Sequence, residues 1–61
     1  SKADVLQLLN TTRAEFLAEI KRMDEKSTGM MSQYAFITWR QERDVLIGQM
    51  LKRIDDLEKK K

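Results

Sequence analysis

Hydrophobic residues recur every three or four positions along most of the chain, which is the spacing of one face of an α-helix. This pattern forms two stripes, separated by a short polar interruption near the middle of the sequence. On a wheel of about 100° per residue, the first stripe contains Leu6, Leu9, Phe16, Leu17, Ile20 and Met23. The second stripe contains Phe36, Trp39, Leu46, Ile47, Met50, Ile54 and Leu57. The pattern therefore predicts two amphipathic helices.

The polar interruption marks the loop between these helices. It contains Ser27, Thr28 and Gly29 in a chain with no proline. Gly29 is a C-cap signal for the first helix, because glycine adopts the left-handed backbone conformation at low cost. Ser32 is suited to cap the second helix. The opening residues 1–4 resemble a capping box for the first helix, with aspartate in place of the usual glutamate.

The boundaries give two helices of nearly equal length. We predict a helix at about residues 2–27, a loop at about 28–31 and a helix at about 32–59. Two long helices joined by a short loop lie side by side as an antiparallel hairpin. The predicted fold class is therefore all-α. A strand at about residues 34–39 has some local propensity, but it would have no partner strand.

The apolar arcs of both predicted helices are wider than one hairpin contact requires. The apolar residues outside the main stripes are Val5, Leu8, Tyr34, Ile37, Val45 and Leu51. They would remain exposed in a monomer, whereas each helix of a four-helix bundle contacts two neighbours and needs a wide apolar arc. Chains of this length also bury a small core and commonly need oligomerisation. We therefore expect homodimerisation into an antiparallel four-helix bundle or a coiled-coil-like assembly.

The residues along the centre of the two stripes form the predicted interface with a partner chain. They are Leu6, Leu9, Arg13, Phe16, Ile20, Phe36, Trp39, Arg43, Leu46, Met50, Ile54 and Leu57. A second partner patch consists of Tyr34, Ile37 and Val45. An alternative function is therefore a hairpin that docks on a heterologous protein helix with the Trp39 face as anchor, because Trp and Tyr dominate protein-binding hot spots.

Two arginines fall within the apolar stripes. Arg13 lies in the middle of the first stripe and Arg43 in the middle of the second. With the loop centred near Gly29, both arginines are predicted to share one layer of the hairpin. A buried, unpaired charge is very costly, so we expect flanking acids to pair with them. The candidate acids are Glu15, Glu19, Glu42 and Asp44.

Three interpretations of this arginine layer remain open. In the first, the arginines bury their aliphatic stems and pair with acids at the edge of the bundle. In the second, the charged layer selects register and partner, as polar seam positions do in coiled coils. In the third, it binds an anionic ligand or substrate.

The weakest helix-forming segment of the first helix is Asn10-Thr11-Thr12, and the predicted pairing places it opposite Gly48. This coincidence suggests a helix break, a kink or a close approach of the two backbones. The alternative is a solvent-facing polar stretch beside a tolerated glycine.

The net charge comes from the end of the chain. Removing the three lysines at residues 59–61 from a net charge of +2 leaves a net charge of −1. A nucleic-acid-binding domain usually shows a basic face. A small dimeric nucleic-acid regulator that uses Lys52, Arg53 and the lysine tail is therefore an alternative that the charge pattern does not favour.

The residue types present argue against several classes of function. The chain has no Cys and no His, so we expect no metal site and no cofactor. Its acids are spread singly along the helices and no glycine-rich phosphate loop occurs, so we do not expect an enzyme. No apolar run has the length of a membrane span. We expect a soluble chain, and the lack of Cys favours an intracellular setting.

Overall fold

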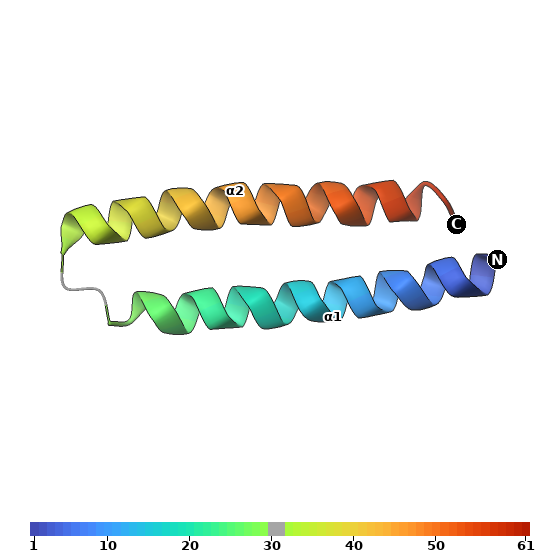
Figure 1. Cartoon of the computed structure of the whole chain (residues 1–61), viewed down its shortest axis with the longest axis horizontal. Coiled ribbons are helices and arrows are strands. Elements are labelled where there is room, and N and C mark those ends of the chain that lie inside the picture. Colours follow the sequence, from blue (N-terminus) through green and yellow to red (C-terminus); the bar gives the residue numbers. More distant parts are fainter. Residues whose placement is uncertain (30–31) are drawn as a thin grey trace.

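The computed structural model describes residues 1–29 and 32–61 and is a helical hairpin (Figure 1). Helix α1 spans Lys2–Ser27 and helix α2 spans Gln33–Glu58. The two helices pack against each other in antiparallel orientation, so both termini lie at the same end of the molecule. The predicted all-α hairpin is confirmed, with helix boundaries that agree to within one residue. The predicted loop includes Met30 and Met31, which lie outside the described residues.

Serine caps begin both helices as the sequence predicts. The Ser1 hydroxyl accepts a hydrogen bond from the Asp4 backbone N–H at 3.3 Å, and the Asp4 carboxylate completes the capping box. The Ser32 hydroxyl accepts from the Ala35 N–H at 3.2 Å. Each cap satisfies a backbone donor that has no partner within its helix.

The end of α1 differs from the prediction. Gly29 does not have a positive φ, so the predicted left-handed glycine C-cap is wrong. Instead Thr28 is the C-cap, with right-handed backbone angles of φ −65° and ψ −22°. The Ser27 hydroxyl donates to the Asp24 carbonyl at 2.7 Å, and the Thr28 hydroxyl donates to the Glu25 carbonyl at 2.7 Å. These side chains satisfy carbonyls of the last turn without a left-handed residue.

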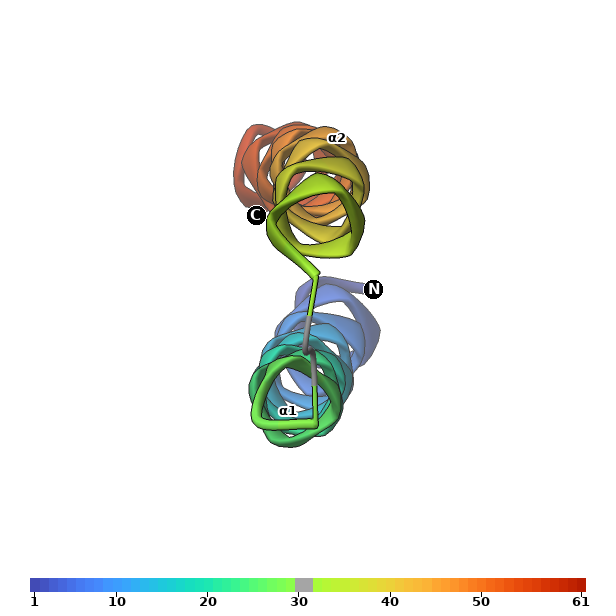
Figure 2. The ribbon, with the colours of Figure 1, turned by 90° about the vertical axis from the view of Figure 1, so that its left-hand side faces the viewer.

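The two helices form a single layer. The Cα positions extend over 48 × 16 × 7 Å, with a radius of gyration of 14.6 Å. A compact domain of this length has a radius of gyration of about 10 Å. Figure 2 shows the layer end-on, with α1 and α2 stacked and both flanks of each helix open. The fold therefore has one line of contact between helices and no third element in the described residues.

The core lies along this line of contact. Leu9 is fully buried, and the other buried apolar side chains of the described residues are Met23, Trp39 and Leu57. Half-buried apolar side chains continue the seam between them. These are Val5, Phe16, Ile20, Leu46, Ile47, Met50 and Ile54.

The structure shows neither a break of α1 at residues 10–12 nor a close approach of the backbones at Gly48. Helix α1 continues through residues 10–12 without a break, and Thr12 is buried. Gly48 is exposed, and a Cβ built on it would meet no atom within 4 Å. Of the two interpretations, the close approach of the backbones is therefore wrong, because Gly48 lies on the side of α2 that points away from α1. The alternative of a tolerated glycine and a solvent-facing stretch holds for Gly48, Asn10 and Thr11, but not for the buried Thr12.

The open surroundings of Gly48 predict that Gly48→Ala stabilises the protein. Alanine has the higher helix propensity and adds no clash, so the free energy of unfolding should rise by about 0.5–1 kcal/mol. Urea unfolding followed by far-UV circular dichroism measures the change at fixed protein concentration. A lower unfolding midpoint in Gly48→Ala would show that another surface packs closely against this position.

Candidate interaction surface

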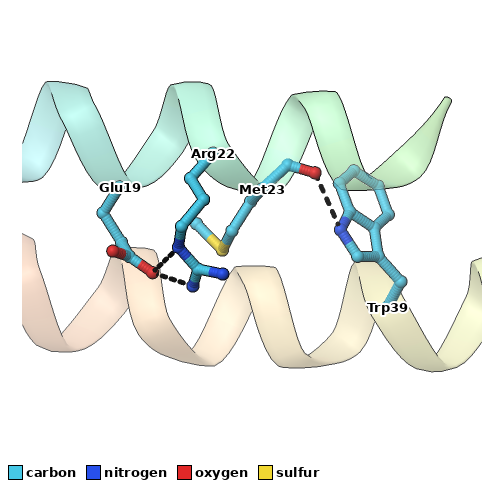
Figure 3. Close-up of polar contacts among 4 residues, drawn as sticks. All are labelled: Glu19, Arg22, Met23 and Trp39. Atoms are coloured by element: carbon cyan, nitrogen blue, oxygen red, sulfur yellow. Dashed lines mark hydrogen bonds and ion pairs between the residues drawn. The ribbon is translucent and has the colours of Figure 1, made fainter.

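A buried hydrogen bond joins the Trp39 side chain of α2 to the backbone of α1. The Trp39 indole Nε1–H donates to the Met23 backbone carbonyl at 3.1 Å (Figure 3). The Trp39 side chain is 7% exposed, and its single polar atom is thereby satisfied. A buried indole needs such a partner, because an unpaired N–H in an apolar contact is costly. The bond fixes the end of α1 near the loop against the first turns of α2.

Trp39 also organises the neighbouring side chains of α2. The Phe36 ring lies 5.3 Å from the Trp39 ring, centroid to centroid, at a tilt of 34°. The Arg43 guanidinium carbon lies 5.1 Å from the Trp39 ring centroid, within the range of a cation–π contact. Arg43 also donates to the Asp44 carboxylate at 3.3 Å, which is one of the predicted acid partners. Trp39 is therefore not available as an exposed anchor for another protein in this structure.

The second seam arginine pairs across the hairpin. Arg13 donates to the Glu58 carboxylate at 2.6 Å, which joins α1 to the last turn of α2. Glu58 is not among the acids predicted for this role. Both side chains of the pair are almost half exposed, at 45% and 41%, so the ion pair itself adds little stability.

The predicted layer shared by Arg13 and Arg43 does not form within the hairpin. Helical side chains lean toward the N-terminus of their own helix. In an antiparallel pair Arg13 therefore reaches toward the open end of the hairpin, whereas Arg43 reaches toward the loop. Arg13 accordingly pairs with Glu58, and Arg43 stacks on Trp39. Each arginine has its own partner, as the edge-pairing interpretation expects, but the partners lie at different levels.

Two further ion pairs form along single helices. Arg22 donates from Nε to the Glu19 carboxylate at 3.1 Å and also bonds it through a second guanidinium nitrogen (Figure 3). This contact lowers the pKa of Glu19 and raises the pKa of Arg22. Near the C-terminus Lys59 pairs with Asp55 at 3.0 Å, which raises the pKa of Lys59. The first of the three tail lysines is thus paired within the chain.

A large amount of apolar side chain remains exposed once the helices have packed. The large exposed apolar residues are Leu6, Leu8, Leu17, Tyr34, Phe36, Ile37, Val45 and Leu51. They come from both helices and from most of their length. Scattered single apolar residues are normal on protein surfaces, but eight large ones are many for so short a chain, and the hairpin leaves much apolar surface uncovered.

The total surface supports the same conclusion. The chain exposes 4897 Å² of solvent-accessible surface. A compact protein of this mass would expose about 4,100 Å². The excess of about 800 Å² is close to what each partner contributes to a standard protein–protein interface.

The structure divides the predicted interface residues into three groups. Leu9, Trp39 and Leu57 are buried between the two helices of one chain. Phe16, Ile20, Arg43, Leu46, Met50 and Ile54 are half-buried along the seam. Leu6, Arg13 and Phe36 are exposed. Their contact with a partner chain stays a prediction.

The predicted second patch is exposed but does not form one compact group. Tyr34 is 81% exposed and borders a shallow hollow with Lys26 and Thr38. Val45 borders another hollow on the same side of α2. Ile37 lies about 60° farther round the helix from Tyr34. Recognition of a partner by these residues stays a prediction.

Three features of the helix contact were not predicted from the sequence: the burial of Thr12, the acceptor role of the Met23 carbonyl and the pairing of Glu58. Thr12 is 4% exposed, and its hydroxyl oxygen has no hydrogen-bond partner in the described residues. Its spacing of three from Leu9 and four from Phe16 places it on the apolar stripe, which is a signal that the sequence already contains. The Met23 carbonyl and the Glu58 carboxylate have roles that depend on which residues face each other, and stripe positions alone do not reveal this.

The described residues contain no group of His, Cys, Asp or Glu that could hold a metal ion. Within the same residues, neither helix combines the length and hydropathy needed to cross a bilayer.

Comparison of the chain with protein families, with curated proteins and with solved structures finds no match. The fold defines the class of the molecule, an all-helical hairpin.

The Trp39–Met23 contact predicts a marked effect of Trp39→Phe on stability. The substitution removes the buried donor and part of the ring volume, so the free energy of unfolding should fall by about 1–3 kcal/mol. Urea unfolding at fixed protein concentration measures this change. Tyr34→Phe is the matched control, because it also alters an aromatic residue of α2 but at a site that is 81% exposed. Equal stability of the two variants would contradict the role assigned to Trp39.

Proposed function

We propose that this chain is a non-enzymatic oligomerisation module, built from a hairpin that self-associates into an antiparallel four-helix bundle. The observation that carries the proposal is the set of large apolar side chains left exposed on both α1 and α2. The single-layer hairpin has no further element to cover them in the described residues, whereas a second hairpin would supply a complementary pair of helices.

Self-association also fits the amount of surface available. The excess of about 800 Å² over a compact chain matches the contribution of one partner to a standard interface. Two copies would together bury about 1,600 Å², which is enough for a specific and stable dimer. Burial of apolar surface on this scale would also compensate for the small core of the isolated hairpin.

The alternatives have weaker support. Docking on a heterologous protein through Trp39 conflicts with the burial of its indole against Met23. A nucleic-acid interface would rest on the lysine tail, of which Lys59 is paired with Asp55. The seam arginines Arg13 and Arg43 are likewise engaged by acids of the same chain.

Sedimentation equilibrium tests the proposal directly. The apparent molar mass should rise with concentration from the 7.2 kDa of the chain toward twice that value. A variant with Lys59, Lys60 and Lys61 replaced by glutamine is the control, because it removes the tail charge without touching the apolar side chains. It should dimerise as strongly as the wild type. A well-folded wild-type monomer at micromolar concentration would refute the proposed function.

A further inference from the structure

The two broad faces of the hairpin differ in character. Because the molecule is one layer thick, each broad face is formed by one flank of α1 and the corresponding flank of α2 (Figure 2). Residues two positions apart on a helix lie about 200° apart and so fall on opposite flanks. The exposed residues Leu6 and Leu8 are such a pair, as are Val45 and Ile47. Contacts between the two helices identify which flank of α1 lies beside which flank of α2.

The Arg13–Glu58 ion pair identifies one of the two faces. Arg13 shares its flank of α1 with Leu6 and Leu17, at spacings of seven and four residues. Glu58 shares its flank of α2 with Ile54, Leu51 and Ile47, at spacings of four, seven and eleven. Because Arg13 and Glu58 bond at 2.6 Å, these two flanks lie side by side. We call this surface the leucine face, which consists of Leu6, Leu17, Ile47, Leu51 and Ile54.

Shared hollows identify the opposite face. Arg22 and Lys26 of α1 line one shallow hollow together with Glu42 of α2. Glu42 also lines a second hollow with Val45 and Gln49. The Glu19–Arg22 ion pair lies on this side as well, because both residues share the flank of Lys26. We call this surface the polar face. Its exposed apolar residues are Leu8, Tyr34 and Val45, and they lie among charged and amide neighbours.

We propose that the leucine face is the surface through which two copies of this chain associate, and that the polar face remains open to solvent in the dimer. This inference rests on the proposed function of self-association and specifies the face that performs it. A two-fold axis would bring the leucine face of one copy onto the same face of the other, which makes the patch self-complementary. Each helix would then contact its hairpin partner and one helix of the second copy, as in a four-helix bundle.

The distribution of apolar area favours this face. Leu17 is 68% exposed and Leu51 is 53% exposed, and both lie beside the half-buried Ile47 and Ile54. From Ile47 to Ile54 the leucine face thus continues the apolar seam of α2 outward. On the polar face, Glu42 and Gln49 flank Val45, and burying them would leave polar groups that need new partners.

The Arg13–Glu58 ion pair of the leucine face is suited to being covered, whereas the exposed Asp24 and Arg40, seven residues from Leu17 and Ile47 on the same flanks, would need water or partners on the second chain. Arg13 and Glu58 already neutralise each other within one chain at 2.6 Å. Covering a pair that is already formed leaves no uncompensated charge, whereas covering one partner alone would be strongly unfavourable. The intrachain ion pair is therefore compatible with a second chain lying over it.

Two matched pairs of substitutions test which face is used. Leu17→Glu alters the leucine face and Leu8→Glu alters the polar face, by the same change on the same helix. Leu51→Glu and Val45→Glu form the corresponding pair on α2. All four side chains are exposed in the hairpin, at 46% to 68%, so none of the changes removes a buried contact within the chain. Leu17→Glu even places a carboxylate four residues from both Arg13 and Lys21, which favours the helix of a monomer.

The readout is the dimer dissociation constant from sedimentation equilibrium, with helix content from circular dichroism. Leu17→Glu and Leu51→Glu should each weaken the dimer by about a hundredfold or more, because each change removes two buried leucines per dimer. Leu8→Glu and Val45→Glu should change the dissociation constant by less than about tenfold. Leu17→Glu could lose its helix content together with the dimer. If Leu8→Glu retains both, this result also supports the proposal.

The other outcomes overturn the proposal and can be told apart. Dissociation by Leu8→Glu and Val45→Glu alone would assign the contact to the polar face. Equal effects of all four changes would show that the association is not specific to one face. A wild-type chain that stays monomeric refutes the proposed function itself, and this result is obtained before any variant is made.

Discussion

Two helices that pack only on each other share one line of contact, and the rest of the structure depends on this constraint. Along this line the chain buries Leu9, Met23, Trp39 and Leu57, and half-buries the apolar residues between them. A layer that extends 48 Å but only 7 Å in its thinnest direction has flanks and almost no interior. Apolar residues on those flanks stay exposed however well the seam is packed, because no third element lies beside them in the described residues.

Several polar groups near the seam find partners without a deep core, although the Thr12 hydroxyl and the Arg43 Nε have none among the described residues. The Trp39 N–H uses a backbone carbonyl of the facing helix. Arg43 lies over the Trp39 ring, and Arg13 reaches the open end of the hairpin to meet Glu58. These contacts define which residues of α1 and α2 lie opposite each other and which flanks of the two helices lie side by side. The same register places Leu6, Leu17 and Leu51 on one broad face, so the geometry of the seam determines which apolar side chains share a surface.

The fold was largely predictable from the sequence, and the contacts across the seam were not. Helix positions follow from local signals, such as the apolar periodicity and the serine caps, and these survive in the structure. The end of α1 was mispredicted because the Ser27 and Thr28 hydroxyls replace the expected left-handed Gly29. The partner of Arg13 depends on the pairing level of the helices and the lean of a long side chain, which a helical wheel does not contain. Pairing level alone left a backbone contact at Gly48 open, whereas its angle places it on the outer side of α2.

In the proposed dimer a second copy covers the leucine face, so the folded state should be stabilised by association. Thermal unfolding monitored by circular dichroism across a hundredfold range of protein concentration tests this claim most directly. Mass action links the midpoint to concentration when folding and dimerisation are coupled. The account predicts that the midpoint rises steadily with concentration. A midpoint that is independent of concentration, with full helix content at the lowest concentration, would contradict it.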